Sequence, residues 1–158
     1  MAEPANENMA QASIEIAASP EVVYDLVADV SRMGQWSPEA TGTVGHPYHL
    51  KAGSRFWGLN RKGLFRWFTL CTVRVAERGK KFEFDVDFWP GGVSRWTYEF
   101  DPAGSGCRVT ETWQDRRVGW RSVPIQNVGR VIIPGPRAAH NQRNIETTLQ
   151  RLKAAAED

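Results

Sequence analysis

One carboxyl group in this chain has the surroundings that acid–base chemistry needs. Glu111 alternates with Val109 and Trp113 in a short segment whose bulky residues lie two apart. In a strand, residues with this spacing point to the same face, which here would be apolar. Desolvation raises the pKa of a carboxyl group on such a face, and the group can then act as a general acid or base. A buried ion pair, with an arginine of a neighbouring strand or of residues 116–121, is the alternative.

Two amide side chains could orient a polar group of a ligand. Asn60 ends an expected strand close to Gly58, a residue that lets a ligand approach the backbone. Its parity with Phe56 points it inward, although an Asn side chain that anchors a turn is the alternative. Asn141 lies four residues before Ile145 on the apolar stripe of the last helix, which predicts an amide near the mouth of an interior cavity.

No motif indicates a metal ion or a cofactor. His140 has no second histidine four residues away and no acidic neighbour in sequence, so we expect it to face solvent. Cys71 and Cys107 fall on separate expected strands without the spacing of metal ligands, and reduced thiols in a cytoplasmic protein explain them. The sequence has no Gly-rich phosphate loop, nucleophile elbow or paired carboxylates. We therefore expect no metal and no cofactor.

Alternating aromatic residues define the elements that must hold these groups. Bulky side chains share one parity in Phe82, Phe84, Val86 and Phe88, and again in Trp96, Tyr98 and Phe100. This alternation predicts an antiparallel sheet with one face lined by rings. Clusters of Gly, Pro and Lys separate the segments, which indicates hairpins. Strands are expected at residues 11–17, 40–46, 53–60, 66–77, 80–87, 93–101 and 106–115.

Helices are expected both before and after the run of hairpins. Ser19 suits an N-cap and Pro20 the first position of a helix, and a second short helix follows. A long C-terminal helix carries apolar residues at helical spacing, namely Ile145, Leu149 and Leu152. This order predicts one α+β domain, residues 11–158, behind a disordered tail of residues 1–10.

The bulk composition narrows the classes of partner. The net charge of +2 comes from 20 basic and 18 acidic residues that are interspersed along the chain, so nucleic acid is not expected. No stretch approaches the ~20 apolar residues of a membrane helix, so stable membrane insertion is not expected either. The N-terminus is polar and does not have the pattern of a signal peptide. We expect a cytoplasmic protein that is a monomer or a homodimer.

Residues 116–136 form a long connection whose role the sequence leaves open. Apolar side chains alternate there with several glycines and prolines. Connections of this length within one domain are typically lids or binding loops. A short helix packed on the edge of the sheet is the alternative.

Parts of the sequence resemble a known family, the START-related superfamily of polyketide cyclases/dehydrases and lipid-transport proteins. The similarity lies in residues 18–39 (ASPEVVYDLVADVSRMGQWSPE), 53–63 (GSRFWGLNRKG), 110–117 (TETWQDRR) and 144–153 (NIETTLQRLK). Within the superfamily, GLNRKG and TETWQDRR resemble a bacterial polyketide-cyclase-like subgroup. The resemblance implies a helix-grip fold, in which a curved seven-stranded antiparallel sheet wraps around the C-terminal helix and leaves an apolar cavity between them.

The expected function is to bind a small hydrophobic molecule, aromatic polyketide-like or lipid-like, as a carrier or binding protein. The ligand would contact Phe56, Asn60, Trp67, Phe84, Trp96, Tyr98, Trp113, Asn141 and Ile145. Trp57 and Trp89 fall on the opposite parity or at a bulge, which places them on the outer face or the rim. One alternative, implied by the resemblance, is an aromatase/cyclase that catalyses aldol cyclisation and dehydration with Glu111 as acid or base. Another is an interaction protein whose cavity is vestigial and whose working surface is residues 118–133.

Overall fold

The computed structural model describes residues 6–158, and the first five residues of the expected tail lie outside the described residues. Its seven strands form one antiparallel sheet with the order β1-β7-β6-β5-β4-β3-β2. The strands are β1 (Met9–Ile16), β2 (Ala40–Val44), β3 (Arg55–Lys62), β4 (Phe65–Glu77), β5 (Lys81–Phe88), β6 (Gly91–Ala103) and β7 (Gly106–Asp115). The helices are α1 (Pro20–Ala28), α2 (Met33–Trp36), α3 (Val123–Ile132) and α4 (Arg137–Glu157), with 3-10 turns η1 (Val30–Arg32) and η2 (Trp120–Ser122).

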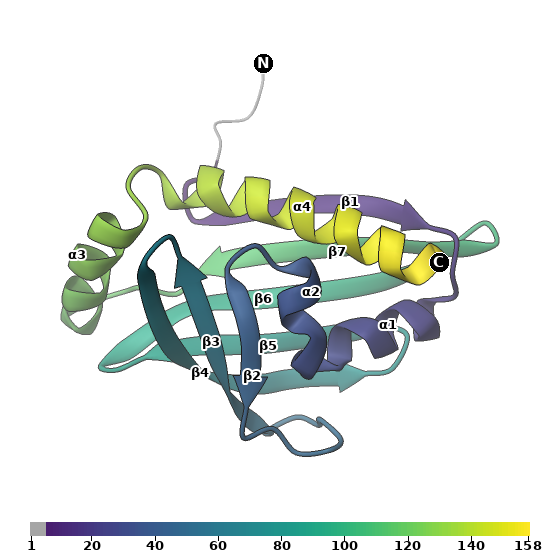
Figure 1. Ribbon diagram of the computed structural model, residues 1–158, viewed down its shortest axis with the longest axis horizontal. Helices are drawn as coiled ribbons and strands as arrows, with labels where there is room; N and C mark the ends of the chain where they lie inside the picture. Colours follow the sequence, from purple (N-terminus) through teal and green to yellow (C-terminus); the bar gives the residue numbers. More distant parts are fainter. Residues whose placement is uncertain (1–5) are drawn as a thin grey trace.

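The long helix α4 covers one face of the sheet. It packs along β1 and β7 and also contacts α1 and α2, which lie on the same side of the sheet (Figure 1). Its own residues Ile145, Leu149 and Leu152 are buried on the side that faces the sheet. The predicted α+β class and the helix-grip arrangement are therefore confirmed.

Local sequence explains the short helices that close the other end of this face. The Ser19 hydroxyl accepts a hydrogen bond from the Val22 amide at 3.3 Å, and Pro20 occupies the first turn of α1. Helix α2 lies against β2 because Gly34 has no side chain: a Cβ there would be 2.6 Å from the Thr41 carbonyl oxygen. The contact brings the segment between α2 and β2 to the edge of the covered face.

The hairpin between β6 and β7 sets the neighbours of the predicted acid. Ala103 pairs with Gly106 across a two-residue turn, so Tyr98 lies directly opposite Glu111 and Trp96 opposite Trp113. On the other side of β7, β1 begins at Met9, two residues before the predicted start, and its buried Ala10 pairs with Trp113. All the inward-facing residues of β7 are therefore paired with β1 on one side and with β6 on the other.

Candidate functional site

A cavity of about 100 Å³ lies between the sheet and α4. Most of the predicted ligand-binding residues line it, together with the predicted acid: Asn60, Trp67, Phe84, Trp96, Tyr98, Glu111, Trp113 and Asn141. Two predicted residues do not reach it. Phe56 and Ile145 are fully buried in the core, where Phe56 packs behind Phe84 with ring centroids 6.0 Å apart.

Glu111 is the most deeply buried charged-type residue of the cavity wall, with 1% of its surface exposed. Its Oε1 accepts a hydrogen bond of 2.7 Å from the Tyr98 hydroxyl across the β6–β7 pair. Burial raises the pKa of Glu111 to about 8, and the Tyr98 hydrogen bond opposes this only in part. The carboxyl group is therefore mostly protonated at neutral pH.

The arginine partner that the sequence allowed for Glu111 is not found among residues 6–158. Arg116 instead forms an ion pair with Asp87 at 3.1 Å, and Arg117 one with Asp115 at 2.6 Å. Without a compensating cation, a fully buried carboxylate would be costly, which agrees with the neutral form.

Two polar atoms in the cavity wall lack a hydrogen-bond partner within the described part of the chain. They are Glu111 Oε2 and Asn141 Nδ2, and both residues are about 1% exposed. Glu111 belongs to β7 and Asn141 to α4, which packs on the sheet, and both residues line the cavity. Most buried polar groups in proteins are paired, so this pair of orphan atoms marks a place for a ligand or a water molecule.

Asn60 takes a different role from Asn141. Its amide donates weak hydrogen bonds of 3.4 Å to the Gly58 carbonyl and to the Thr69 hydroxyl. Asn60 therefore does not anchor a turn: it lies within β3, opposite Trp67, and its amide group is held by the cavity wall that it lines.

A polar cluster at one end of α4 was missed by the sequence reasoning. His140 does not face solvent: its Nε2 is hydrogen-bonded to Glu39 Oε1, and the Asn144 amide lies 3.1 Å from the same nitrogen. Burial would raise the pKa of Glu39, but the hydrogen bond from His140 and the charge of Arg137 hold it below its usual value. Glu39 comes from the segment before β2, so only the tertiary structure supplies this acidic partner. Four polar residues of α4 that line the cavity follow helical spacing, so the sequence did indicate that they share one face of the helix. They are Arg137, Asn141, Asn144 and Thr148.

Residues 116–136 contain the 3-10 turn η2 and helix α3, and α3 roofs a second compartment of about 80 Å³. This outer compartment shares Trp67, Thr69, Val93 and Arg137 with the main cavity, so the two are neighbours across those side chains. Ile125 and Ile133 are buried against it, whereas Val128 and Val131 are more than half exposed. The segment is therefore a helix that packs on the sheet through one side only.

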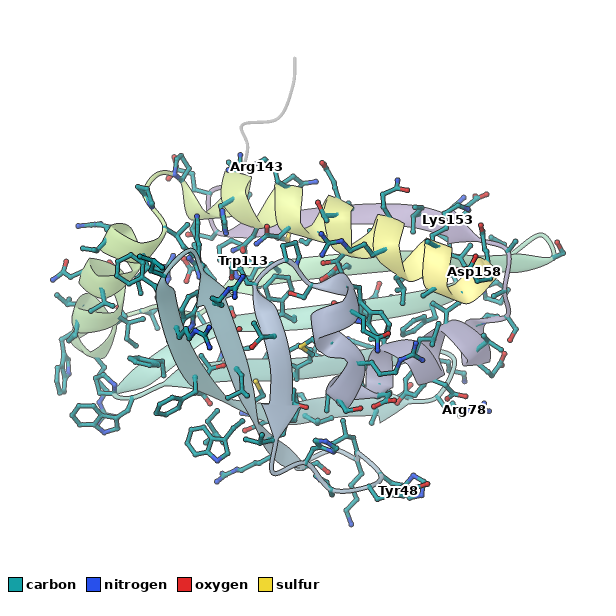
Figure 2. The ribbon with its side chains drawn as sticks, in the orientation of Figure 1. Tyr48, Arg78, Trp113, Arg143, Lys153 and Asp158 are labelled. Carbon is teal, nitrogen blue, oxygen red and sulfur yellow. The ribbon has the colours of Figure 1, made fainter. Side chains whose placement is uncertain are left out.

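The tryptophans divide between the two faces of the sheet. Trp67, Trp96 and Trp113 line the cavity. Trp57 is 43% exposed and lies in edge contact with Phe68 at 5.6 Å, and Trp89 is 90% exposed. Both lie along an open groove of the outer face together with Leu70 and Phe88. Figure 2 shows Trp113 lying beneath the start of α4, behind the edge strands of the sheet.

The described residues contain no group of three or more His, Cys, Asp or Glu side chains that could hold a metal ion. Burial raises the pKa of the Cys71 thiol, which also lines the cavity, to about 12, so this thiol is not a nucleophile at neutral pH. None of the helices in residues 6–158 is long and apolar enough to cross a membrane.

Solved structures with the same fold are numerous. The polyketide-cyclase-like protein Cgl2372 from Corynebacterium glutamicum is 26% identical, with a TM-score of 0.58 over 94% of this chain and 88% of that one. A START superfamily protein from Mycobacterium smegmatis is 14% identical, with a TM-score of 0.68 over 95% and 97% of the two chains. The protein TTHA0849 from Thermus thermophilus is 19% identical, with a TM-score of 0.64 over 94% and 96%.

Among curated proteins, no sequence matches this chain. The family model described as polyketide cyclase / dehydrase and lipid transport matches residues 9–157, from the start of β1 to the end of α4. The match includes every strand of the sheet and every residue that lines the cavity. This chain therefore belongs to the polyketide cyclase/dehydrase and lipid transport family.

Proposed function

We propose that this protein binds a small, largely apolar molecule in the cavity beneath α4 and acts as a carrier or binding protein. The observation that carries the proposal is the pair of unpartnered atoms, Glu111 Oε2 and Asn141 Nδ2, in a cavity whose exposed wall area is mostly apolar. An unsatisfied buried polar group costs roughly 1–3 kcal/mol. A ligand with one polar end and an apolar body would remove that cost and fill the cavity.

The dimensions of the site limit the ligand. An apolar cavity of ~150 Å³ is enough to bind benzene. The main cavity of about 100 Å³ and the neighbouring compartment of about 80 Å³ would together hold one ring with a short substituent. A larger polyketide-like or acyl ligand requires outward movement of α3, whose contact with the sheet is one-sided.

Native mass spectrometry of the freshly purified protein tests this proposal. We expect a small-molecule adduct that is lost on denaturation, or binding of an added single-ring probe with one molecule per chain. Val93 lines both compartments, so the larger side chain of Val93→Phe fills space in them and is expected to abolish the adduct. Trp57→Ala, on the outer face, is the control and is expected to retain it. Equal occupancy in Val93→Phe and the wild type would place the ligand elsewhere and contradict the proposal.

Helix α3 is expected to respond to occupancy of the cavity. Its apolar side chains are only partly buried, since Val123, Val128 and Val131 are each more than half exposed, so the empty protein should open this segment often and exchange its amide hydrogens early. Hydrogen exchange followed by mass spectrometry is expected to slow in residues 118–133 when a ligand binds, while strands β5–β7 change little. Full protection of the segment in the empty protein would show that it belongs to the rigid core.

A cyclase activity is the second candidate, and the neutral form of Glu111 favours it. Burial raises the pKa of this carboxyl group to about 8, so it carries a proton at neutral pH beside the open space of the cavity. In an aldol closure the enol carbon of a poly-β-ketone forms a bond to a ketone carbon, and Glu111 would give its proton to the ketone oxygen as this becomes a hydroxyl. The enol loses its own proton to solvent or to the carboxylate so formed, and loss of water then leaves a C=C bond. Incubation with a linear triketone tests this: mass spectrometry would detect product one water lighter from the wild type but not from Glu111→Gln.

A further inference from the structure

We propose that the polar end of the ligand is a carbonyl oxygen, as in a ketone, enone or quinone, which accepts hydrogen bonds from the Glu111 carboxyl Oε2–H and the Asn141 amide Nδ2–H. The inference rests on the proposed function and specifies the chemistry of its ligand. It disfavours alcohols and phenols, because their own hydroxyl proton would need a further acceptor at this point.

The position of the carboxyl proton follows from the needs of Tyr98. Its hydroxyl is buried, and the acceptor that it reaches among residues 6–158 is Glu111 Oε1, at 2.7 Å. A buried phenolic hydroxyl requires an acceptor, so its proton points to Oε1. Oε1 is then the carbonyl oxygen of the neutral carboxyl group, and Oε2 carries the proton. That O–H is directed at the cavity and has no partner in the described chain.

Among residues 6–158, no cation forms an ion pair with Glu111 that would favour its ionised form. The charged groups that line the cavity are Glu39 and Arg137, near the start of α4, and they are linked to each other by their charges. Glu111 itself is hydrogen-bonded to Tyr98 from β6, and the α4 residues Asn141, Asn144 and Thr148 that line the same cavity are neutral. The pKa of Tyr98 is raised well above its ordinary value by burial and by Glu111, so this phenol also stays neutral. The inner end of the cavity is therefore uncharged at neutral pH.

Asn141 supplies the second donor from the opposite wall. Its Nδ2 is buried without a partner in residues 6–158, and an amide nitrogen can only donate. Two donors, one on the sheet and one on the helix, match the two lone pairs of one carbonyl oxygen. An alcohol oxygen could accept the same bonds, but its own proton would then give up its hydrogen bond to water and need a third partner in the cavity wall, which a carbonyl oxygen does not.

Three probes with the same carbon skeleton test this chemistry: acetophenone, 1-phenylethanol and ethylbenzene. Calorimetric or NMR titration at pH 6.5 is expected to show acetophenone binding at least ~10-fold more tightly than either of the others, since each net hydrogen bond contributes about 1 kcal/mol. Equal binding of the three, or tighter binding of the alcohol, would overturn this inference and leave the proposed function intact. Binding of none of them would contradict the proposed function, and the inference with it.

Two variants separate the donors from the shape of the cavity. Asn141→Leu keeps the volume but removes the N–H groups, so acetophenone affinity is expected to fall about tenfold while ethylbenzene affinity is retained or rises. Glu111→Gln keeps an acceptor for Tyr98 and an N–H donor for the ligand, so acetophenone affinity is expected to stay within about threefold. The ethylbenzene affinity reports on folding of the cavity in each variant. An equal loss of all three probes in Asn141→Leu would show a structural role and refute the assignment of Asn141.

The pH dependence provides an independent readout. Because the pKa of Glu111 is raised to about 8, Oε2 loses its proton above that pH and becomes an acceptor that repels a carbonyl oxygen. The ratio of acetophenone to ethylbenzene affinity is expected to fall between pH 6.5 and 9 in the wild type and to stay constant in Glu111→Gln. A constant ratio in the wild type over this range would overturn the proposed role of the carboxyl proton.

Discussion

Glu111→Gln is expected to make the protein markedly more stable relative to the wild type as the pH rises from about 4.5 to about 8, the ordinary and the raised pKa of this carboxyl group. Below pH 4.5 the group holds its proton in both the folded and the unfolded chain. Between the two values the unfolded chain releases the proton and the folded chain keeps it, so the stability of the wild type falls by about 1.4 kcal/mol per pH unit from this group alone. Above pH 8 both states are ionised and this contribution becomes constant. Gln cannot ionise, and the variant therefore lacks this loss.

Urea unfolding at several pH values, compared between wild type and variant, measures this effect. Groups with lowered pKa values, such as Glu39 and Asp85, contribute less to the free energy of unfolding as the pH falls. Their contributions are the same in both proteins and cancel in the difference. Glu99→Gln is the matched control, since it removes an exposed carboxylate of β6 that forms no ion pair within residues 6–158. The interpretation fails if wild type and Glu111→Gln show the same dependence on pH. It also fails if the variant loses several kcal/mol at pH 5, which a hidden ion pair would cause.

Trp113→Ala is expected to cost about 3–5 kcal/mol of unfolding free energy, the range for truncation of a fully buried large aromatic residue. Trp113 is 2% exposed and is paired with Ala10 of β1 on one side and Trp96 of β6 on the other. Its removal enlarges the cavity at the point where α4 begins to cross the sheet. Trp57→Ala, on the outer face, is expected to change stability by about 1 kcal/mol or less. Thermal and urea unfolding of both variants provide the comparison.

Ligand binding should separate the same two faces. Trp96→Ala removes a partly exposed ring that lines the cavity, so it is expected to weaken binding of an aromatic probe without the full stability cost of Trp113→Ala. Trp57→Ala is expected to bind the probe as the wild type does. Comparable losses of affinity in Trp96→Ala and Trp57→Ala would mean that the assignment of faces is wrong.

The sequence alone determined the faces of the strands and the class of the fold. Alternation in a strand is a local property with a period of two, so the parity of Phe84, Trp96 and Trp113 was enough to predict which side they share. Start signals such as Ser19-Pro20 and the apolar stripe of the last helix are equally local. Most of the predicted ligand-binding residues line the cavity for this reason, although Phe56, on the inward parity of β3, and Ile145, on the apolar stripe of α4, are buried in the core instead.

Only the tertiary structure decided what each polar group meets. Tyr98 became the partner of Glu111 through the register of the β6–β7 hairpin, for which the two-residue turn was a signal that sequence reasoning did not use. Glu39, in the segment after α2, reached His140 through the packing of α4 against α2, across about a hundred residues of chain. The position of α3 over the outer compartment depends on which side of this helix packs against apolar residues of other elements. Side-chain periodicity is set within one element, whereas hydrogen bonds and cavities depend on distances between elements, and these arise only when the sheet and helices pack together.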